Sequence, residues 1–218
     1  MSLPISPPTS PVLSRLILAA IIAACFSAPP ADATSTGPQA GSTGVPEHGE
    51  LAAEMICTAC HTTAALNPDD KGAIALDGVP TNYEPGQAYD LTFRITHPDP
   101  QFLRWGFQLT AIRTDTYHRA GELVVTDPIT TQLVDGGPGN RQYMEHSYGG
   151  TAIGQSGGTA WSFRWVAPSQ STGPVAFYAV GNAANVDGAN TGDHVYSRSP
   201  AALALISPAS PLPAHDCQ

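Results

Sequence analysis

Charged residues are scarce in this chain: Asp, Glu, Lys and Arg make up 12% of its 218 residues, with 9 Lys and Arg against 18 Asp and Glu. The few basic residues form no patch, so the composition argues against a nucleic-acid partner. Low charge combined with 21 Gly and 21 Pro also argues against a helical bundle and against a charged disordered chain. An all-β domain with many turns is the class that remains.

Long apolar runs are also missing, apart from one near the N-terminus. Arg15 precedes the apolar run 16–24, and Ala31-Asp32-Ala33 follows it. A positive residue, a short apolar stretch and small residues at a cleavage point are typical of a secretory signal peptide, here residues 1–33. The run is too short to span a bilayer as a permanent helix. We therefore expect an exported protein of the periplasm or the cell surface.

Cys25 offers a second interpretation of this leader. Residues 22–25, Ile-Ala-Ala-Cys, resemble a bacterial lipobox, and cleavage before Cys25 would leave a lipidated, membrane-tethered lipoprotein. Cleavage after Ala33 is our first expectation, and a membrane is a partner only if Cys25 is lipidated. Cys217 lies in a Pro-rich tail, 207–218, where it stays free or pairs between chains.

Between the leader and the first predicted strands lies a Gly/Pro-rich segment, 34–74, which contains the sequence CTACH. We expect residues 34–50 to be an extended or disordered linker and residues 51–56 to form a short helical turn. From about residue 75, apolar and polar residues alternate in short runs separated by Gly and Pro turns. This period predicts strands at 89–95, 105–112, 122–125, 130–134, 142–147, 160–166, 175–180, 195–198 and 201–206.

So many short alternating strands predict a β-sandwich over residues 75–206, with a closed barrel as the alternative. Because apolar and polar residues alternate in these strands, and the strands are not apolar throughout, a parallel α/β sheet is disfavoured. Trp161, Phe163 and Trp165 share one face of their strand and are predicted to lie in the core.

Cys57, Cys60 and His61 carry the clearest chemical signal. Cys-x-x-Cys-His is the attachment signal of c-type haem: the two thiols bond to the haem vinyl groups, and the imidazole becomes an axial ligand of the iron. A local disulfide and a metal or redox clip are the competing interpretations. The sequence contains one such motif, so electron transfer would involve a redox partner protein or self-association.

An iron bound to His61 needs a sixth ligand or keeps an open position. His146 is the first candidate and His48 the second, while a buried His146 that hydrogen-bonds a loop is the competing interpretation. The oxygen-rich loop 182–193 suggests calcium binding or, as we prefer, a hydrogen-bonded turn. No His-Glu-x-x-His zinc motif is present.

Several stretches of the chain together resemble a known family. They are YEPGQAY at 83–89, GFQLT at 106–110, YMEHS at 143–147, WSFRWVAP at 161–168, GPVAFYAVGNAAN at 173–185 and GDHVY at 192–196. In order and spacing this series resembles the Reeler (reelin N-terminal-like) domain in its bacterial, choice-of-anchor V form. The resemblance implies an immunoglobulin-like β-sandwich and supplies no reaction.

The segment before the sandwich adds to this resemblance. Many bacterial members resemble this chain in having Gly-Pro and Thr-Gly-x-Pro ahead of Cys-x-x-Cys-His, here GP at 37–38 and TGVP at 43–46. Eukaryotic Reeler domains lack this element, which looks like an addition with its own role.

Three functions stay open on this evidence. The first is an exported monohaem c-type protein that transfers electrons through covalently bound haem. The second is a cell-surface binding or adhesion module with a structural disulfide and no haem. The third is a haem sensor or enzyme with an open sixth position. A carrier or binding protein is favoured over an enzyme.

Overall fold

The computed structural model describes residues 34–198, 202 and 204–210. The predicted signal peptide with Cys25, and the end of the tail with His215 and Cys217, lie outside these residues. No helix in the described part of the chain has the length and apolar character needed to cross a membrane.

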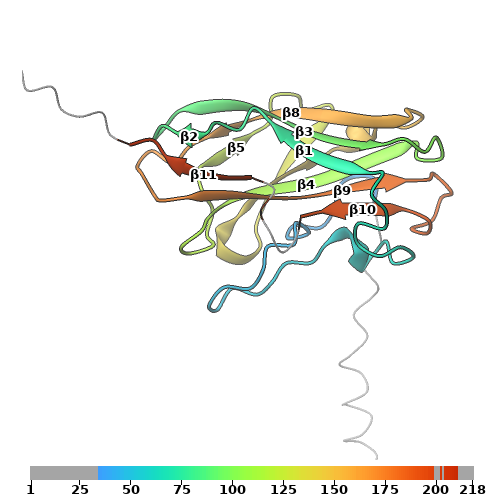
Figure 1. Cartoon of the computed structure of the whole chain (residues 1–218), viewed down its shortest axis with the longest axis horizontal. Helices are drawn as coiled ribbons and strands as arrows, with labels where there is room; N and C mark the ends of the chain where they lie inside the picture. Colours follow the sequence, from blue (N-terminus) through green and yellow to red (C-terminus); the bar gives the residue numbers. More distant parts are fainter. Residues whose placement is uncertain (1–33, 199–201, 203, 211–218) are drawn as a thin grey trace, which may run out of the picture. The chain divides into compact units, whose positions relative to one another are not determined.

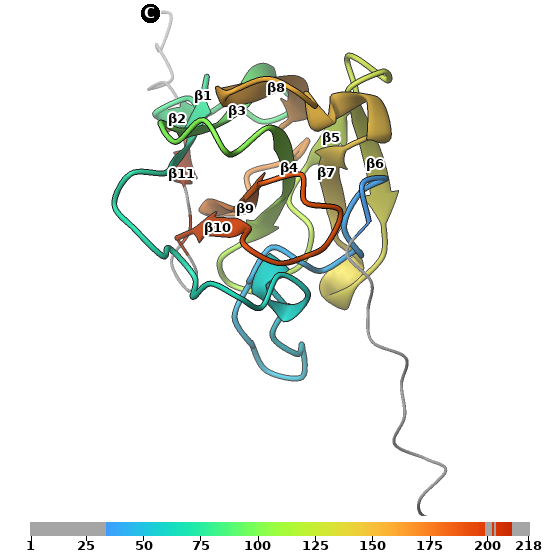
Figure 2. The ribbon, with the colours of Figure 1, turned by 90° about the vertical axis from the view of Figure 1, so that its right-hand side faces the viewer.

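Two β-sheets pack face to face as a sandwich (Figures 1 and 2). The smaller sheet has the order β1-β3-β8-β5, and the larger has the order β2-β11-β9-β4-β7-β6, with β10 also pairing with β9. The strands are β1 (Ala73–Asp77), β2 (Asn82–Tyr83), β3 (Ala88–His97), β4 (Arg104–Arg113), β5 (Glu122–Val124), β6 (Thr131–Asp135), β7 (Gln142–His146), β8 (Gly157–Val166), β9 (Val175–Ala184), β10 (His194–Ser197) and β11 (Ala204–Pro208). There are also three short 3₁₀ turns in the described residues: η1 (Cys57–Ala59) precedes β1, while η2 (Pro138–Asn140) and η3 (Tyr148–Thr151) lie on either side of β7.

The predicted fold class, an all-β sandwich, is confirmed. Each sheet is built around one long antiparallel pair, β3 with β8 and β4 with β9, in which all ten residues of each strand are paired. The predicted strand positions correspond to β3 through β11. The sequence pattern missed β1 and β2, because β1 reads AIALD, with two small alanines, and β2 has only two residues.

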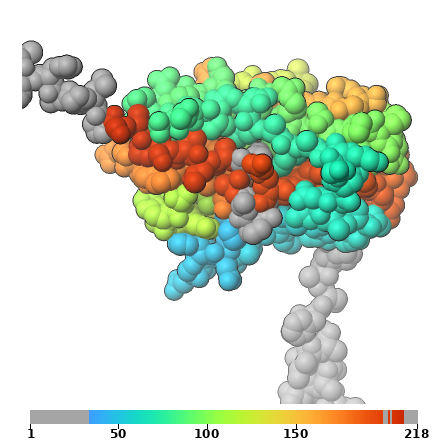
Figure 3. Space-filling model, viewed as in Figure 1, coloured from blue at the N-terminus to red at the C-terminus, as the bar shows by residue number. Residues whose placement is uncertain are grey.

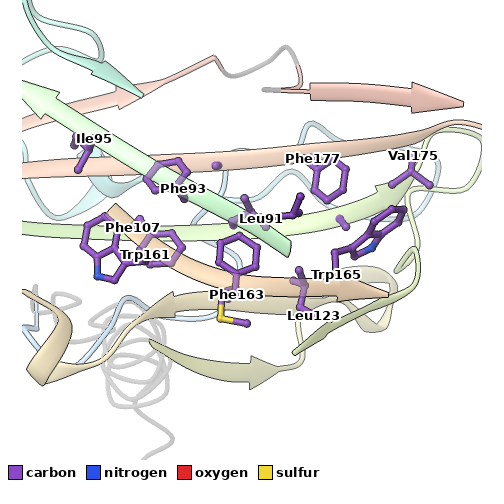
Figure 4. Close-up of a cluster of buried hydrophobic side chains, with 14 of the residues drawn as sticks. Leu91, Phe93, Ile95, Phe107, Leu123, Trp161, Phe163, Trp165, Val175 and Phe177 are labelled. Atoms are coloured by element: carbon purple, nitrogen blue, oxygen red, sulfur yellow. The ribbon is translucent and has the colours of Figure 1, made fainter. Parts of the chain in front are cut away.

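The core lies between the sheets and is made of alternate residues of their long strands (Figure 4). Trp161, Phe163 and Trp165 of β8 are all buried there, as their period of two predicted. Gly181 on β9 allows close packing, because a Cβ atom at this position would lie 2.9 Å from side-chain atoms of Ile74 and Ile95.

The larger sheet is covered on its outer face as well, by the segment 34–61. This segment passes beneath β9 and β4 in Figure 2, and its blue and teal atoms form part of the lower surface in Figure 3. Thr43 and Val45 are fully buried, and Val45 packs against Ile112 and Tyr178 of the sheet. As a result, the eight inner residues of β4 are buried on both faces.

Two expectations for this segment were wrong. Residues 35–45 do not form a disordered linker, because they bond to the sheet through backbone and side-chain groups, while residues 47–50 are exposed at the tip of the hairpin. Residues 51–56 form no helical turn: they run back along 43–48 as an irregular hairpin, with β-bridges between Thr43 and Ile56 and between His48 and Leu51. The 3₁₀ turn begins only at Cys57.

Polar side chains of the sheet hold the covering segment in place. The Gln108 amide accepts from the Ser42 N–H at 2.7 Å and donates to the Gln39 carbonyl oxygen at 3.1 Å and to the Glu145 carboxylate at 2.8 Å. Gln108 is fully buried, so these bonds satisfy an amide that would otherwise be costly to desolvate.

The strongest attachment is the Glu54 carboxylate, which is buried against β7. It forms an ion pair with Arg141 and accepts a hydrogen bond from the Tyr143 hydroxyl at 2.6 Å and another from Thr43. The exposed fractions of the Arg141 and Glu54 side chains are 0% and 1%. Because water reaches neither charge, removing one leaves the other buried without a partner.

Replacing Glu54 by glutamine should therefore destabilise the fold by about 3–5 kcal/mol, since the Arg141 charge stays buried. Urea unfolding of the purified protein measures the change. The matched control is Asp77→Asn, which breaks a pair with Arg94 whose two side chains are about half exposed. That change should cost less than about 1 kcal/mol. Equal losses for the two variants would contradict the role assigned to Glu54.

Candidate functional site

The CTACH sequence forms a single tight turn at the end of the hairpin. The N–H groups of Cys60 and His61 both donate to the Cys57 carbonyl oxygen, at 3.1 and 2.9 Å. One 3₁₀ turn therefore presents all three side chains of the motif together. The Cys57 thiol is free, so no disulfide joins it to Cys60.

The Cys57 thiol is not of the reactive redox type. Burial, with smaller contributions from Cys60 and Glu145, raises its pKa to about 12. Dithiol oxidoreductases need a cysteine whose pKa is lowered, because the thiolate is the attacking species. The arrangement thus argues against a thioredoxin-like activity for the motif.

His61 is held by a buried carboxylate from the far end of the chain. Its Nδ1 lies 2.6 Å from Oδ2 of Asp193, whose side chain is 2% exposed. The other oxygen of Asp193 accepts the Asn185 N–H at 3.0 Å. Since a carboxylate only accepts here, Nδ1 of His61 carries a proton, and in the neutral ring the lone pair lies on Nε2. Metal-binding histidines have this arrangement, with the non-ligating nitrogen donating to a carboxylate.

Asn182 packs against the His61 ring. Its amide nitrogen lies 3.4 Å from Nε2 and 3.5 Å from Nδ1, nearly the same distance from both ring nitrogens. The amide oxygen of Asn182 is buried and has no hydrogen-bond partner among the described residues. The amide is thus held from its nitrogen side alone, and the donor set of Cys57, Cys60 and His61 is the one that haem c uses.

The loop between β9 and β10 packs directly on the motif. Asn190 donates to the Cys60 carbonyl oxygen at 2.7 Å, and the Gly192 N–H donates to the Thr63 hydroxyl at 2.6 Å. Within the loop, Asp187 accepts from the Ala189 N–H at 2.8 Å. These contacts are those of the hydrogen-bonded turn predicted for 182–193.

His146 bonds to the backbone of a neighbouring strand. Its Nδ1 accepts the Phe107 N–H at 3.0 Å, where the pairing between β4 and β7 ends. A Cβ atom at residue 106 would lie 2.7 Å from the ring, so only Gly106 allows this contact. Burial lowers the pKa of His146 to about 4, against the weaker raising effect of the Phe107 carbonyl oxygen, which lies 3.2 Å from Nδ1. These contacts give His146 a structural role, and its service as sixth ligand stays a prediction.

His48 and His61 lie at opposite ends of the sheet. It stacks on Tyr117, with Nε2 3.1 Å from the Asp115 carbonyl oxygen, beyond the C-terminal end of β4. Asn182, which contacts His61, pairs near the opposite end of β4. The strand between them spans about 24 Å at about 3.4 Å per residue. In this structure His48 thus lies far from His61, and its service as a ligand stays a prediction.

A cluster that the sequence pattern did not reveal joins Asp69, His97 and His194, whose ligand atoms lie within 4.8 Å of one another. The Nδ1 of His97 accepts the Asp99 N–H at 3.0 Å, so its proton sits on Nε2, which faces Asp69 at 3.3 Å. A metal on Nε2 would require the opposite tautomer. Burial opposes ionisation of Asp69, but hydrogen bonds from His97, Tyr196 and two backbone N–H groups hold its pKa well below the usual range. The cluster anchors the chain between the motif and β1.

Ser156 occupies a Gly-x-Ser-x-Gly spacing at 154–158. In hydrolases such a serine sits between a strand and a helix. Here the stretch leads directly into β8, so the nucleophile turn is not formed.

Comparison with known proteins finds resemblance only at the level of structure. No family model matches the chain, and no curated protein matches it significantly. A solved Reeler domain of human F-spondin is 21% identical, with a TM-score of 0.43, covering 64% of this chain and 89% of that one. AvmM, which catalyses macrocyclization in alchivemycin A biosynthesis, is 13% identical with a TM-score of 0.41, covering 66% and 92%. Reeler domains are thus among the similar structures, at scores that establish no family and no activity.

Acid should destabilise the protein through His146. In the unfolded chain the ring takes up a proton near pH 6.5, but in the folded protein only near pH 4. The free energy of unfolding is therefore unaffected by His146 above about pH 6.5. It decreases by about 3 kcal/mol as the pH falls toward 4. In His146→Asn the amide oxygen still accepts the Phe107 N–H but does not titrate. Urea unfolding from neutral pH downward should show a shallower loss for this variant, and an identical slope would contradict the assignment.

Asn182→Ala should leave the thermal unfolding midpoint unchanged or raise it, because it removes a buried acceptor that has no partner. The control is Asn67→Gly, since the Asn67 amide makes two hydrogen bonds to the Ser197 backbone and glycine accepts its positive φ of 52°. The control should lower the midpoint. A clear loss of stability in Asn182→Ala would contradict this expectation.

Proposed function

We propose that this protein is an exported monohaem c-type protein that transfers electrons, with haem bonded to Cys57 and Cys60 and iron bound by His61. The observation that carries the proposal is the pairing of a Cys-x-x-Cys-His turn with a buried carboxylate, Asp193, on Nδ1 of its histidine. An acceptor on Nδ1 is what a metal-binding imidazole uses to fix its orientation, and a carboxylate is one of the acceptors found there.

Each residue of the site has a distinct task in this proposal. The two thiols would hold the macrocycle, and Nε2 of His61 would bind the iron. Asp193 accepts from Nδ1, which leaves Nε2 as the ligating nitrogen, and Asn182 packs against the ring. The bound haem supplies a reversible one-electron change of its iron. No proton needs to move on the protein during that change.

The partner of such a carrier is another protein. The formal net charge of −9 favours encounter with a basic redox protein, while a single motif makes transfer between copies of this chain the alternative. The motif lies in a surface segment outside the strands, which allows close approach of a partner. Export places the thiols in the compartment where haem c is attached, as the predicted leader implies.

The test is expression of the full chain in a host that matures c-type cytochromes. We expect red protein whose intact mass exceeds that of the chain by one haem, with a Soret band that survives denaturation. Cys57→Ala combined with Cys60→Ala should fold and lose the covalent band. Colourless protein from a competent host would refute the proposal. Carbon monoxide binding to the reduced form would indicate an open sixth position, and hence a sensor or enzyme.

A surface binding module is the second candidate, and exposed apolar residues favour it. The exposed fractions of Ile129, Tyr148 and Ile153 are 73%, 66% and 59%. Their two loops are tied together, because the Ser147 N–H donates to the Thr130 carbonyl oxygen at 3.0 Å. Exposed apolar groups on adjacent loops are typical of contact sites. This function predicts a mass without haem in the same experiment.

A further inference from the structure

The Asp193 side chain uses both carboxylate oxygens, and each has one donor. Oδ1 accepts the backbone N–H of Asn185 at 3.0 Å, and Oδ2 accepts from Nδ1 of His61 at 2.6 Å. No Lys or Arg pairs with Asp193 in the part of the chain that the structure describes. The Asp193 carboxylate is 2% exposed, and its two hydrogen-bond donors are the backbone N–H of Asn185 and the ring N–H of His61.

Anchoring of the loop does not explain this buried charge. The same loop is already attached to the motif by Asn190 on the Cys60 carbonyl oxygen and by Gly192 on Thr63. An uncharged residue at position 193 would avoid the cost of desolvating a carboxylate. What a carboxylate adds, and an uncharged residue does not, is a strong and purely accepting partner for the His61 N–H.

We propose that Asp193 is the positioning residue of His61, and that it sets both the tautomer of the ring and the reduction potential of the site. A carboxylate on Nδ1–H makes the imidazole a stronger electron donor through Nε2. Stronger donation stabilises the oxidised iron more than the reduced iron, and so lowers the potential. This inference rests on the proposed function, and it predicts a lower potential than the same site would have without the carboxylate.

Asp193→Asn is the informative change, because an amide has one accepting oxygen where the carboxylate has two. The variant must lose either the Asn185 bond or the His61 bond. We expect the haem content of the holoprotein to be retained and the preference for oxidised iron to weaken about tenfold, a positive shift of about 59 mV.

Asp187→Asn is the matched control. It lies in the same loop and removes the same charge, but Asp187 is exposed and bonds only within the loop. Its potential should stay close to that of the unchanged protein. If the reduction potential shifted equally in the two variants, the loss of overall charge would explain the shift, and the proposal would be overturned. Asp193→Glu, which restores the charge, should recover part of the shift.

A measurement on the protein without haem separates this inference from the function it rests on. Nitrogen-15 NMR of the His61 ring should show the proton on Nδ1 in the unchanged apoprotein and a shift toward Nε2 in Asp193→Asn. A proton on Nε2 in the unchanged protein would overturn the proposal, even if the variant fails to fold. Absence of haem after expression in a competent host would instead refute the proposed function.

Discussion

The position of the CTACH turn depends on one buried contact, the Glu54 carboxylate against Arg141 and Tyr143. Glu54 lies three residues before Cys57, at the end of a hairpin that has few other apolar anchors than Val45. A hairpin of this kind would slide along the sheet if only hydrophobic burial held it, because such burial is not directional. A charge pair with several hydrogen bonds has one geometry, and so it fixes where the motif sits.

The larger sheet is adapted to receive this hairpin. Its outer face carries Gln108, Thr110 and Glu145, which are polar and yet fully buried. Burial raises the pKa of Glu145, while the amides of Gln108 and Gln132 act in the opposite direction by hydrogen bonding. The face is therefore neither a second apolar core nor a solvated surface. It is a polar docking surface whose donors and acceptors are matched to the backbone of 36–45.

The sequence predicted those parts of the fold that follow from local periodicity. Strands β3 to β11 and the tryptophan stripe of β8 show the period of two within a few residues. The period does not show that the polar face of β4 is also buried: Gln108 bonds to the distant Ser42 and Thr110 to Gln142 of the neighbouring strand β7. Small residues hid β1, and an abundance of Gly and Pro made an ordered segment look like a linker.

Of the candidate site, the sequence predicted only the residues that lie close together along the chain. Cys57, Cys60 and His61 lie within five residues and have a fixed spacing, so they are visible in the sequence. Asp193 was visible only as one oxygen-bearing residue of a turn, and Asn182 likewise. Nothing in their local pattern points to His61, since 132 and 121 residues separate them from it. Contacts between residues so far apart in the sequence are seen only in the folded structure, where β9 and β10 bring Asn182 and Asp193 next to His61.

The same separation has a consequence for biogenesis. The motif is synthesised early, but Asn182 and Asp193, which contact His61, follow it by more than 120 residues. Contacts so distant in sequence form late in folding. For a time, therefore, the two thiols and the imidazole are accessible on an unfolded chain. That time ends when the loop 185–193 folds and makes its contacts with Cys60 and His61. Any enzyme that modifies Cys57 and Cys60 competes with folding for the same substrate, and a faster-folding variant would leave it less time.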